Sequence, residues 1–169
     1  MSTQPKPYLT PEQYLEIDRA AERGSEYYAG EIFPMEAVSL SHSRIVTNLS
    51  AMLHTQLRGR GCEGQGSSLR LRTEARGPYF YPDLMVFRGP AQLEDRRQDT
   101  LTDAVVLASI REYLMPSQDR IKVEQKTRLA TGAWETRETS DALAVLALPS
   151  IGCMIRLADI YAGVEFTAQ

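Results

Sequence analysis

The sequence predicts an α+β fold in which helices pack on a mixed β-sheet with additional hairpins. Two observations predict it: the chain opens with two helix-like segments around one hairpin, and it continues mostly in short β-prone runs. That order is typical of helices packed on a sheet. Its 169 residues, 43% hydrophobic and 24% charged, suit one domain over residues 1–169 and exclude a disordered chain or a disulfide scaffold.

The first helix is predicted to begin at Thr10. Thr10 can cap it, Pro11 fits the first helical position, and Gln13 completes a capping box. The β-prone segment 26–33 then predicts a hairpin with its turn at Ala29-Gly30.

The second helix is predicted over Ser41–Arg58, because apolar residues recur there at steps of four: Ile45, Leu49, Leu53 and Leu57. Sheet segments are expected after it. They are Tyr79–Arg88, Ala104–Leu107, Ile110–Met115, Ile121–Leu129 and Ala133–Thr139, followed by apolar runs at Leu143–Leu148 and Ile151–Tyr161.

Charge limits the classes of partner. The net charge of −3 and pI near 5.5 exclude a protein that holds nucleic acid by bulk charge. A local excess of arginine could still meet phosphates, and a solvated face explains it equally well. The predicted DNA-binding residues are Arg58, Arg60, Arg70 and Arg72. The longest apolar run, Ala142–Leu148, is too short to cross a membrane, so we expect a cytoplasmic protein.

Asp83 is the first candidate for chemistry. In one strand over Tyr79–Arg88 it would share a face with large apolar side chains, where a carboxylate is costly unless it is paired or holds a metal. The alternative is that Asp83 stands at the exposed end of the strand and caps a turn after Pro82.

Two glutamates of the hairpin are the second candidate. A turn at Ala29-Gly30 puts Tyr28 opposite Glu31, so Glu26 lies diagonal to Glu31 on the same face. Such a carboxylate pair suits a hard cation such as Mg²⁺. The alternative is two solvated glutamates on the polar side of a hairpin.

Two further features are candidates, a glutamate–lysine pair and a histidine. Glu124 and Lys126, taken with Pro82-Asp83, spell the Pro-Asp … Glu-x-Lys pattern of metal-dependent nucleases, but they also suit the ordinary polar face of a hairpin strand. His42 stands at the start of the second helix, where a functional role is conceivable.

Read together, these segments resemble a large bacterial family of restriction endonucleases within the PD-(D/E)XK nuclease superfamily. The marks run along nearly the whole chain. They are Leu9–Leu15, Glu26–Ile32, Ser41–Ile45, Tyr81–Phe87, Arg111–Leu114, Gln118–Arg120, Leu148–Gly152 and Ala158–Tyr161.

The resemblance implies a restriction-endonuclease-like core that hydrolyses DNA with Mg²⁺ or Mn²⁺. Asp83 matches the metal-binding aspartate, with Glu31 as a second ligand, and Glu26 and His42 match characteristic positions near the site. We also expect a homodimer.

The sequence departs from the family pattern after Leu107. A strand carrying the second catalytic glutamate and a helix carrying a lysine are expected there, roughly 25 to 30 residues that the chain lacks. Glu124 and Lys126 do not replace them, because they match a later hairpin strand. Either a segment is omitted between Leu107 and Ala108, or the deletion is real. A real deletion would leave a catalytically inactive DNA-binding or dimeric module on the same fold, or a purely structural oligomer.

Overall fold

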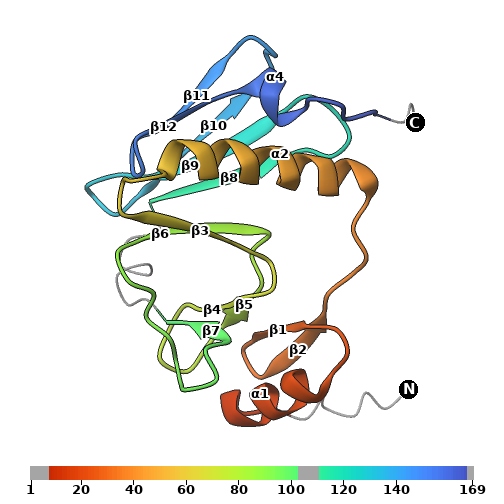
Figure 1. The fold of residues 1–169 in the computed structure, drawn as a ribbon. Coiled ribbons are helices and arrows are strands. Elements are labelled where there is room, and N and C mark those ends of the chain that lie inside the picture. Colours follow the sequence, from red (N-terminus) through yellow and green to blue (C-terminus); the bar gives the residue numbers. More distant parts are fainter. Residues whose placement is uncertain (1–7, 103–110, 167–169) are drawn as a thin grey trace. The chain divides into compact units, whose positions relative to one another are not determined.

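The chain folds into two compact units, each assembled from separate stretches of sequence (Figure 1). The computed structural model describes residues 8–102 and 111–166. The first unit contains the chain up to Ala37, Gln65–Asp83 and the segment that starts at Pro90. The second contains Val38–Gly64, Leu84–Gly89 and the C-terminal part. Helices and several sheets are both present, which confirms the predicted α+β class.

The first unit is built on a five-stranded sheet of order β2-β1-β5-β4-β7. The strands are β1 (Ser25–Tyr28), β2 (Glu31–Pro34), β4 (Arg70–Arg72), β5 (Tyr79–Phe80) and β7 (Thr100–Leu101). Helix α1 (Pro11–Ala20) contacts β1, and Thr10 and Gln13 form the predicted capping box. Stacked and tilted rings fill the core of this unit: Tyr14, Tyr27 and Tyr79.

The hairpin β1–β2 has the predicted turn and register. Ala29 and Gly30 both have positive φ, 49° and 85°, as a two-residue turn of the primed type requires. Tyr28 pairs with Glu31, and Tyr27 pairs with Ile32. The hairpin prediction is therefore confirmed, including the face that Glu26 and Glu31 share.

The prediction of a single strand over Tyr79–Arg88 is wrong. The chain forms β5 and then β6 (Leu84–Arg88), and Tyr81-Pro82-Asp83 lies between them outside any strand. The physical reason is Pro82, which has no backbone N–H to donate to a ladder. Asp83 consequently does not share a strand face with apolar side chains, and it is exposed.

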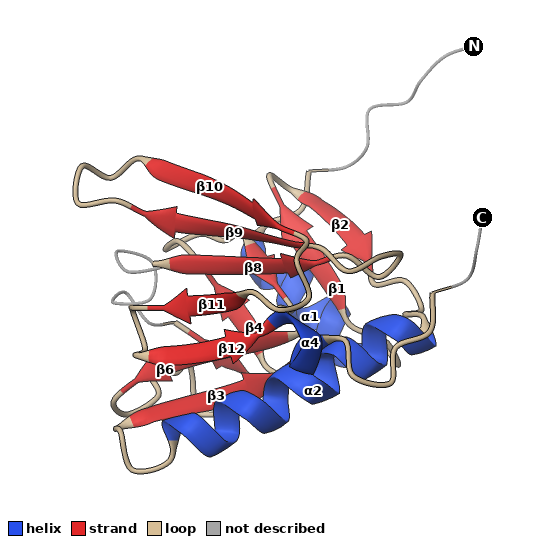
Figure 2. Ribbon diagram, turned by 90° about the horizontal axis from the view of Figure 1, so that it is seen from above, coloured by secondary structure: helices blue, strands red, loops and turns tan. Residues whose placement is uncertain are grey.

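The second unit buries one face of a long helix, α2 (Leu40–Leu57), against β12 (Cys153–Arg156) and α4 (Leu157–Ile160) (Figure 2). The predicted stripe is confirmed, because Ile45, Leu49, Leu53 and Leu57 are all buried in one core. The remaining strands are β3 (Cys62–Gly66), which pairs with β6, β8 (Glu112–Pro116), β9 (Val123–Arg128), β10 (Trp134–Thr139) and β11 (Val145–Leu148).

The strands β10-β9-β8 form one antiparallel sheet and β11-β12 form another. The β9–β10 hairpin agrees with the sheet segments expected at Ile121–Leu129 and Ala133–Thr139, and its connection is Ala130-Thr131-Gly132. The strand predicted at Ala104–Leu107 and the Leu107–Ala108 junction lie outside the described residues. Within residues 8–102 and 111–166, no helix is long and apolar enough to cross a membrane.

Replacing Leu53 with Ala tests the core of the second unit. Leu53 is 6% exposed in the main apolar cluster, so its truncation leaves a cavity. We expect Leu53→Ala to lower the free energy of unfolding by about 2–5 kcal/mol, measured by urea denaturation. The exposed neighbour His54 is the control, and His54→Ala should change it by less than about 0.5 kcal/mol. Equal effects of the two substitutions would contradict the assignment of Leu53 to the core.

Candidate functional site

Asp83 ends the irregular segment Tyr81-Pro82-Asp83, and its side chain faces solvent. The carboxylate of Glu26 contacts this segment, because its Oε1 accepts a hydrogen bond of 3.3 Å from the backbone N–H of Tyr81. Glu26 therefore reaches the chain two residues before Asp83. Glu31 lies on the same hairpin face as Glu26, as the strand register requires.

The chemistry of these side chains suits a hard cation. Mg²⁺ binds oxygen ligands and is usually held by one or two carboxylates, together with waters and substrate phosphates. Asp83, Glu26 and Glu31 all belong to the first unit and offer carboxylates only. Among the described residues, no three acidic, histidine or cysteine side chains are close enough together to form a complete metal cage. A metal ion at these carboxylates stays a prediction, and such an ion would need further ligands from water or a substrate.

The other candidates are placed elsewhere. His42 belongs to the first turn of α2 in the second unit, and its backbone N–H donates to the Ser39 side chain at 3.1 Å. Glu124 and Lys126 lie on β9 and form an ion pair with each other, Nζ to Oε1, at 3.4 Å. That pairing is the ordinary polar face of a hairpin strand, the alternative that the sequence left open.

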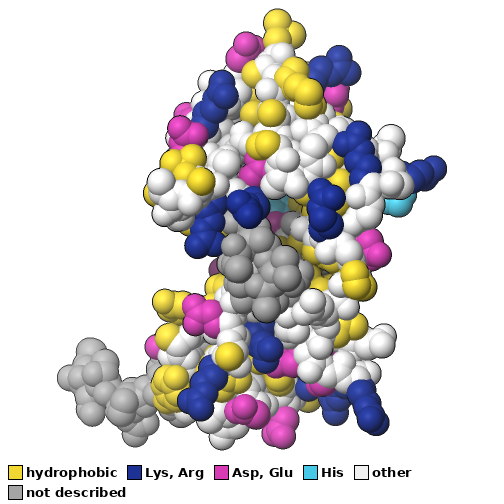
Figure 3. Space-filling view, turned by 90° about the vertical axis from the view of Figure 1, so that its left-hand side faces the viewer, with side chains coloured by type: hydrophobic (Ala, Val, Ile, Leu, Met, Phe, Trp, Pro, Cys, Tyr) yellow, Lys and Arg dark blue, Asp and Glu magenta, His cyan; other side chains and the backbone are white. Residues whose placement is uncertain are grey.

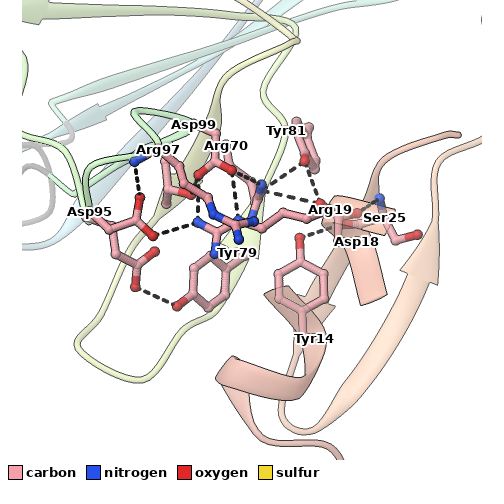
Figure 4. A network of polar contacts seen from close by, with 12 residues as sticks. Tyr14, Asp18, Arg19, Ser25, Arg70, Tyr79, Tyr81, Asp95, Arg97 and Asp99 are labelled. Carbon is pink, nitrogen blue, oxygen red and sulfur yellow. Dashed lines mark hydrogen bonds and ion pairs between the residues drawn. The ribbon is translucent and has the colours of Figure 1, made fainter. Parts of the chain in front are cut away.

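A buried polar network holds the segment before Asp83 (Figure 4). The Tyr81 hydroxyl donates to Asp18 Oδ2 at 2.7 Å and accepts from Arg70 Nε at 2.9 Å. The Asp18 side chain is 1% exposed, and its Oδ1 also accepts a hydrogen bond of 2.6 Å from the Ser25 backbone N–H. Burial, and then the bond to Asp18, raise the pKa of Tyr81 to about 12, so its hydroxyl stays protonated and donates at neutral pH.

A second layer of this network lies on the other side of Arg70. Arg70 Nη2 donates a hydrogen bond of 3.1 Å to Asp99, and Arg19 donates two hydrogen bonds of 2.8 and 2.9 Å to the same carboxylate. Arg19 also donates to Asp95 at 2.8 Å. The Arg19 hydrogen bonds, with help from Thr100 and the charge of Arg70, lower the pKa of Asp99 to about 2.

Sequence reasoning missed this network, although one signal was present. Asp18 is four residues after Tyr14, so both face the same side of α1, and both are buried. An aspartate on the apolar face of an amphipathic helix indicates a polar partner in the core. The identity of that partner, Tyr81, depends on contacts between residues 63 positions apart.

The arginines predicted to bind DNA belong to two different units. Arg58 and Arg60 are exposed in the second unit, where Arg60 Nη1 donates to the Gly152 carbonyl oxygen at 2.7 Å. Arg70 is 3% exposed within the network described above. Arg72 pairs with Glu94 at 2.6 Å. We therefore assign Arg70 and Arg72 to the internal structure of the first unit and leave them out of any DNA-binding surface.

Comparison with known families agrees with the family resemblance seen in the sequence. The model of the Uma2 family, described as "Putative restriction endonuclease", matches residues 11–108, more than half of the chain. The chain belongs to this family. Its superfamily is the restriction-endonuclease-like one, which confirms the resemblance seen in the sequence.

Two relatives come from the cyanobacterium Synechocystis sp., and both are described as uncharacterized proteins. One is 33% identical over 102 residues, 60% of this chain, and the match spans 58% of that relative's own length. The other is 26% identical over 185 residues and covers 96% of both chains. The match covers 96% of this chain, about 162 of its 169 residues, over 185 aligned positions, so about 23 residues of that relative have no counterpart here.

A solved structure shares the fold. It is a crystal structure from Anabaena variabilis described as "a putative nuclease belonging to DUF820", with a TM-score of 0.71, 15% identity, and coverage of 91% of this chain and 98% of that one. The Uma2 match ends at residue 108, next to the point where the sequence departs from the family pattern.

The Asp99 carboxylate provides a pH test of the network. Its lowered pKa means that the folded state is stabilised above pH 4, and that this contribution is lost as pH falls from about 4 to about 2. We expect Asp99→Asn to lower the free energy of unfolding by about 2 kcal/mol at pH 7, and the difference from wild type to vanish near pH 2.

Urea denaturation at several pH values measures this difference. Asp95→Asn is the matched control, because Asp95 binds the same Arg19 from a more exposed position, and its effect should be smaller. A difference between wild type and Asp99→Asn that does not change with pH would contradict the assignment.

Proposed function

We propose that this Uma2 member is a Mg²⁺- or Mn²⁺-dependent DNA endonuclease, with Asp83 as the central metal-binding carboxylate. The observation that carries the proposal is the position of Asp83: it is exposed after Pro82, on a segment that Glu26 and the Asp18–Tyr81–Arg70 network hold in place. Family membership supports a nuclease, and DNA is the substrate that the family description suggests.

The acidic side chains of the first unit have different roles in this proposal. Asp83 and Glu31 would hold the ion, and Glu26 orients the Asp83 segment through the Tyr81 amide. A bound divalent ion supplies two things, a water of lowered pKa and a positive charge beside the phosphate. Tyr81 limits the movement of Asp83, so that its carboxylate is already oriented before substrate arrives.

The charges of the second unit favour it as the contact for the DNA backbone. Among the described residues the second unit has 11 Arg and Lys against 9 Asp and Glu, whereas the first unit has 7 against 12. Arg58 and Arg60 are exposed there. Phosphates are attracted to the more basic unit even though the whole chain is acidic. A homodimer and a cytoplasmic location remain predictions.

A DNA-binding module that does not cleave is the second candidate. Two observations favour it: the Uma2 match stops at residue 108, and about 23 residues of one relative have no counterpart in this chain. If the missing stretch carried the second carboxylate and the lysine, the fold would bind DNA and leave it intact.

Plasmid nicking in Mg²⁺ distinguishes the two candidates. We expect wild type to nick supercoiled plasmid, EDTA to stop nicking, and Asp83→Ala to abolish it while the thermal unfolding curve is unchanged. Asp119→Ala, an exposed aspartate of the second unit, is the control and should cleave like wild type. Full cleavage by Asp83→Ala would refute the metal assignment. An electrophoretic shift that weakens steeply with salt, without nicking, would favour the second candidate.

A further inference from the structure

The sheet β10-β9-β8 has one face that the protein core does not use. Val123 and Gln125 on β9 are buried, so the residues that alternate with them point to the opposite face. The register places Tyr113 opposite Lys126, and Arg128 opposite Trp134. We call these four residues, together with Arg111, the outer platform.

Two aromatic rings lie side by side on the outer platform. The Tyr113 and Trp134 ring centroids are 5.3 Å apart with planes inclined at 45°. Their residues are 45% and 41% exposed, so both rings offer surface to a ligand. The Arg128 guanidinium carbon is 6.0 Å from the Trp134 ring centroid. Aromatic faces flanked by guanidinium groups are surfaces on which planar bases stack.

Positive charge gathers at the same end of this sheet. Arg111 precedes β8 and is exposed. Its carbonyl oxygen accepts a hydrogen bond of 2.8 Å from the Arg128 backbone N–H, so the two arginines are neighbours. The acids of this face, Glu124 and Glu138, lie at the far end of the sheet. They stand opposite each other on β9 and β10, and Glu138 is four residues from Trp134 along β10. Each is bound by a lysine, Lys126 or Lys122. The upper part of Figure 3 shows Lys and Arg side chains exposed on the second unit.

We infer that the outer platform binds single-stranded DNA, with bases stacked on Trp134 and Tyr113 and phosphates paired with Arg111 and Arg128. A duplex keeps its base faces stacked inside, so only an unpaired strand can offer them to exposed rings. The choice of DNA rests on the proposed function.

A second copy of the chain is the other possible occupant, and charge argues against it. A two-fold contact centred on Tyr113 and Trp134 would set Arg111 and Arg128 of one copy against the same residues of its partner. Phosphates carry the opposite charge and are attracted to these arginines.

Trp134 is the only tryptophan in the chain, so its fluorescence reports on this surface alone. The experiment titrates the full chain in EDTA with an oligothymidylate of about 12 nucleotides, a length within the usual range for such sites. We expect saturable quenching of the tryptophan emission, with an affinity that falls as salt rises. Tyr113→Ala should weaken binding by about fivefold to a hundredfold, the loss typical of one stacked base.

Controls separate stacking from general attraction. Tyr28 is an exposed tyrosine of the first unit, and Arg156 is an exposed arginine of β12; Tyr28→Ala and Arg156→Ala should bind like wild type. Anisotropy of a labelled oligonucleotide measures binding independently of Trp134. Binding without quenching, or binding that Tyr113→Ala leaves unchanged, would overturn the inference. So would tighter binding of duplex DNA, or a dimer in light scattering that Tyr113→Ala disrupts.

Because EDTA removes metal, this test does not depend on cleavage. Quenching without any nicking activity would contradict the proposed endonuclease and leave the outer platform intact. Nicking that depends on Asp83, without quenching, would contradict the outer platform as a binding site and leave the proposed endonuclease intact.

Discussion

The buried carboxylate of Asp18 is the constraint on which the first unit depends. A charged carboxylate inside a protein costs several kcal/mol unless hydrogen bonds and an opposite charge replace its hydration. Here the Ser25 amide, the Tyr81 hydroxyl and the Arg70 guanidinium replace it. Those three donors come from three separate stretches of chain. Satisfying one side chain therefore fixes α1 against the start of β1, against β4 and against the segment that leads to Asp83.

This constraint explains how an exposed, irregular segment can still be held in place beside Asp83. Pro82 removes Tyr81-Pro82-Asp83 from the sheet, and the loss of ladder hydrogen bonds would leave it free to move. Tyr81 is instead bound through its hydroxyl to Asp18 and Arg70 and through its amide to Glu26. Its ring also packs close to Gly24, where an added Cβ would come within 3.1 Å of it. Asp83 is thus exposed for a ligand but attached to a rigid neighbour.

Local patterns predicted the local structure well. The Thr10 capping box, the Ala29-Gly30 turn and the four-residue spacing of α2 each depend on residues a few positions apart, and all three are confirmed. Two predictions failed, one at a local strand-breaking residue and one where distant residues decide. The strand over Tyr79–Arg88 breaks at Pro82, and Arg70, which looks like surface charge in the sequence, is buried because Asp18 and Asp99 surround it in the fold. No local sequence pattern indicates that Arg70 has partners 29 and 52 positions away. The aromatic contact of Tyr113 with Trp134 likewise depends on a register across three strands.

The central claim is that Asp83, held by its neighbour Tyr81, is a metal ligand of this Uma2 protein. The most direct measurement is a titration with Mn²⁺ followed by electron paramagnetic resonance, which counts bound ions without requiring cleavage. We predict one saturable site in wild type, weaker binding in Tyr81→Phe, and no binding in Asp83→Ala. Equal Mn²⁺ binding by wild type and Asp83→Ala would contradict it.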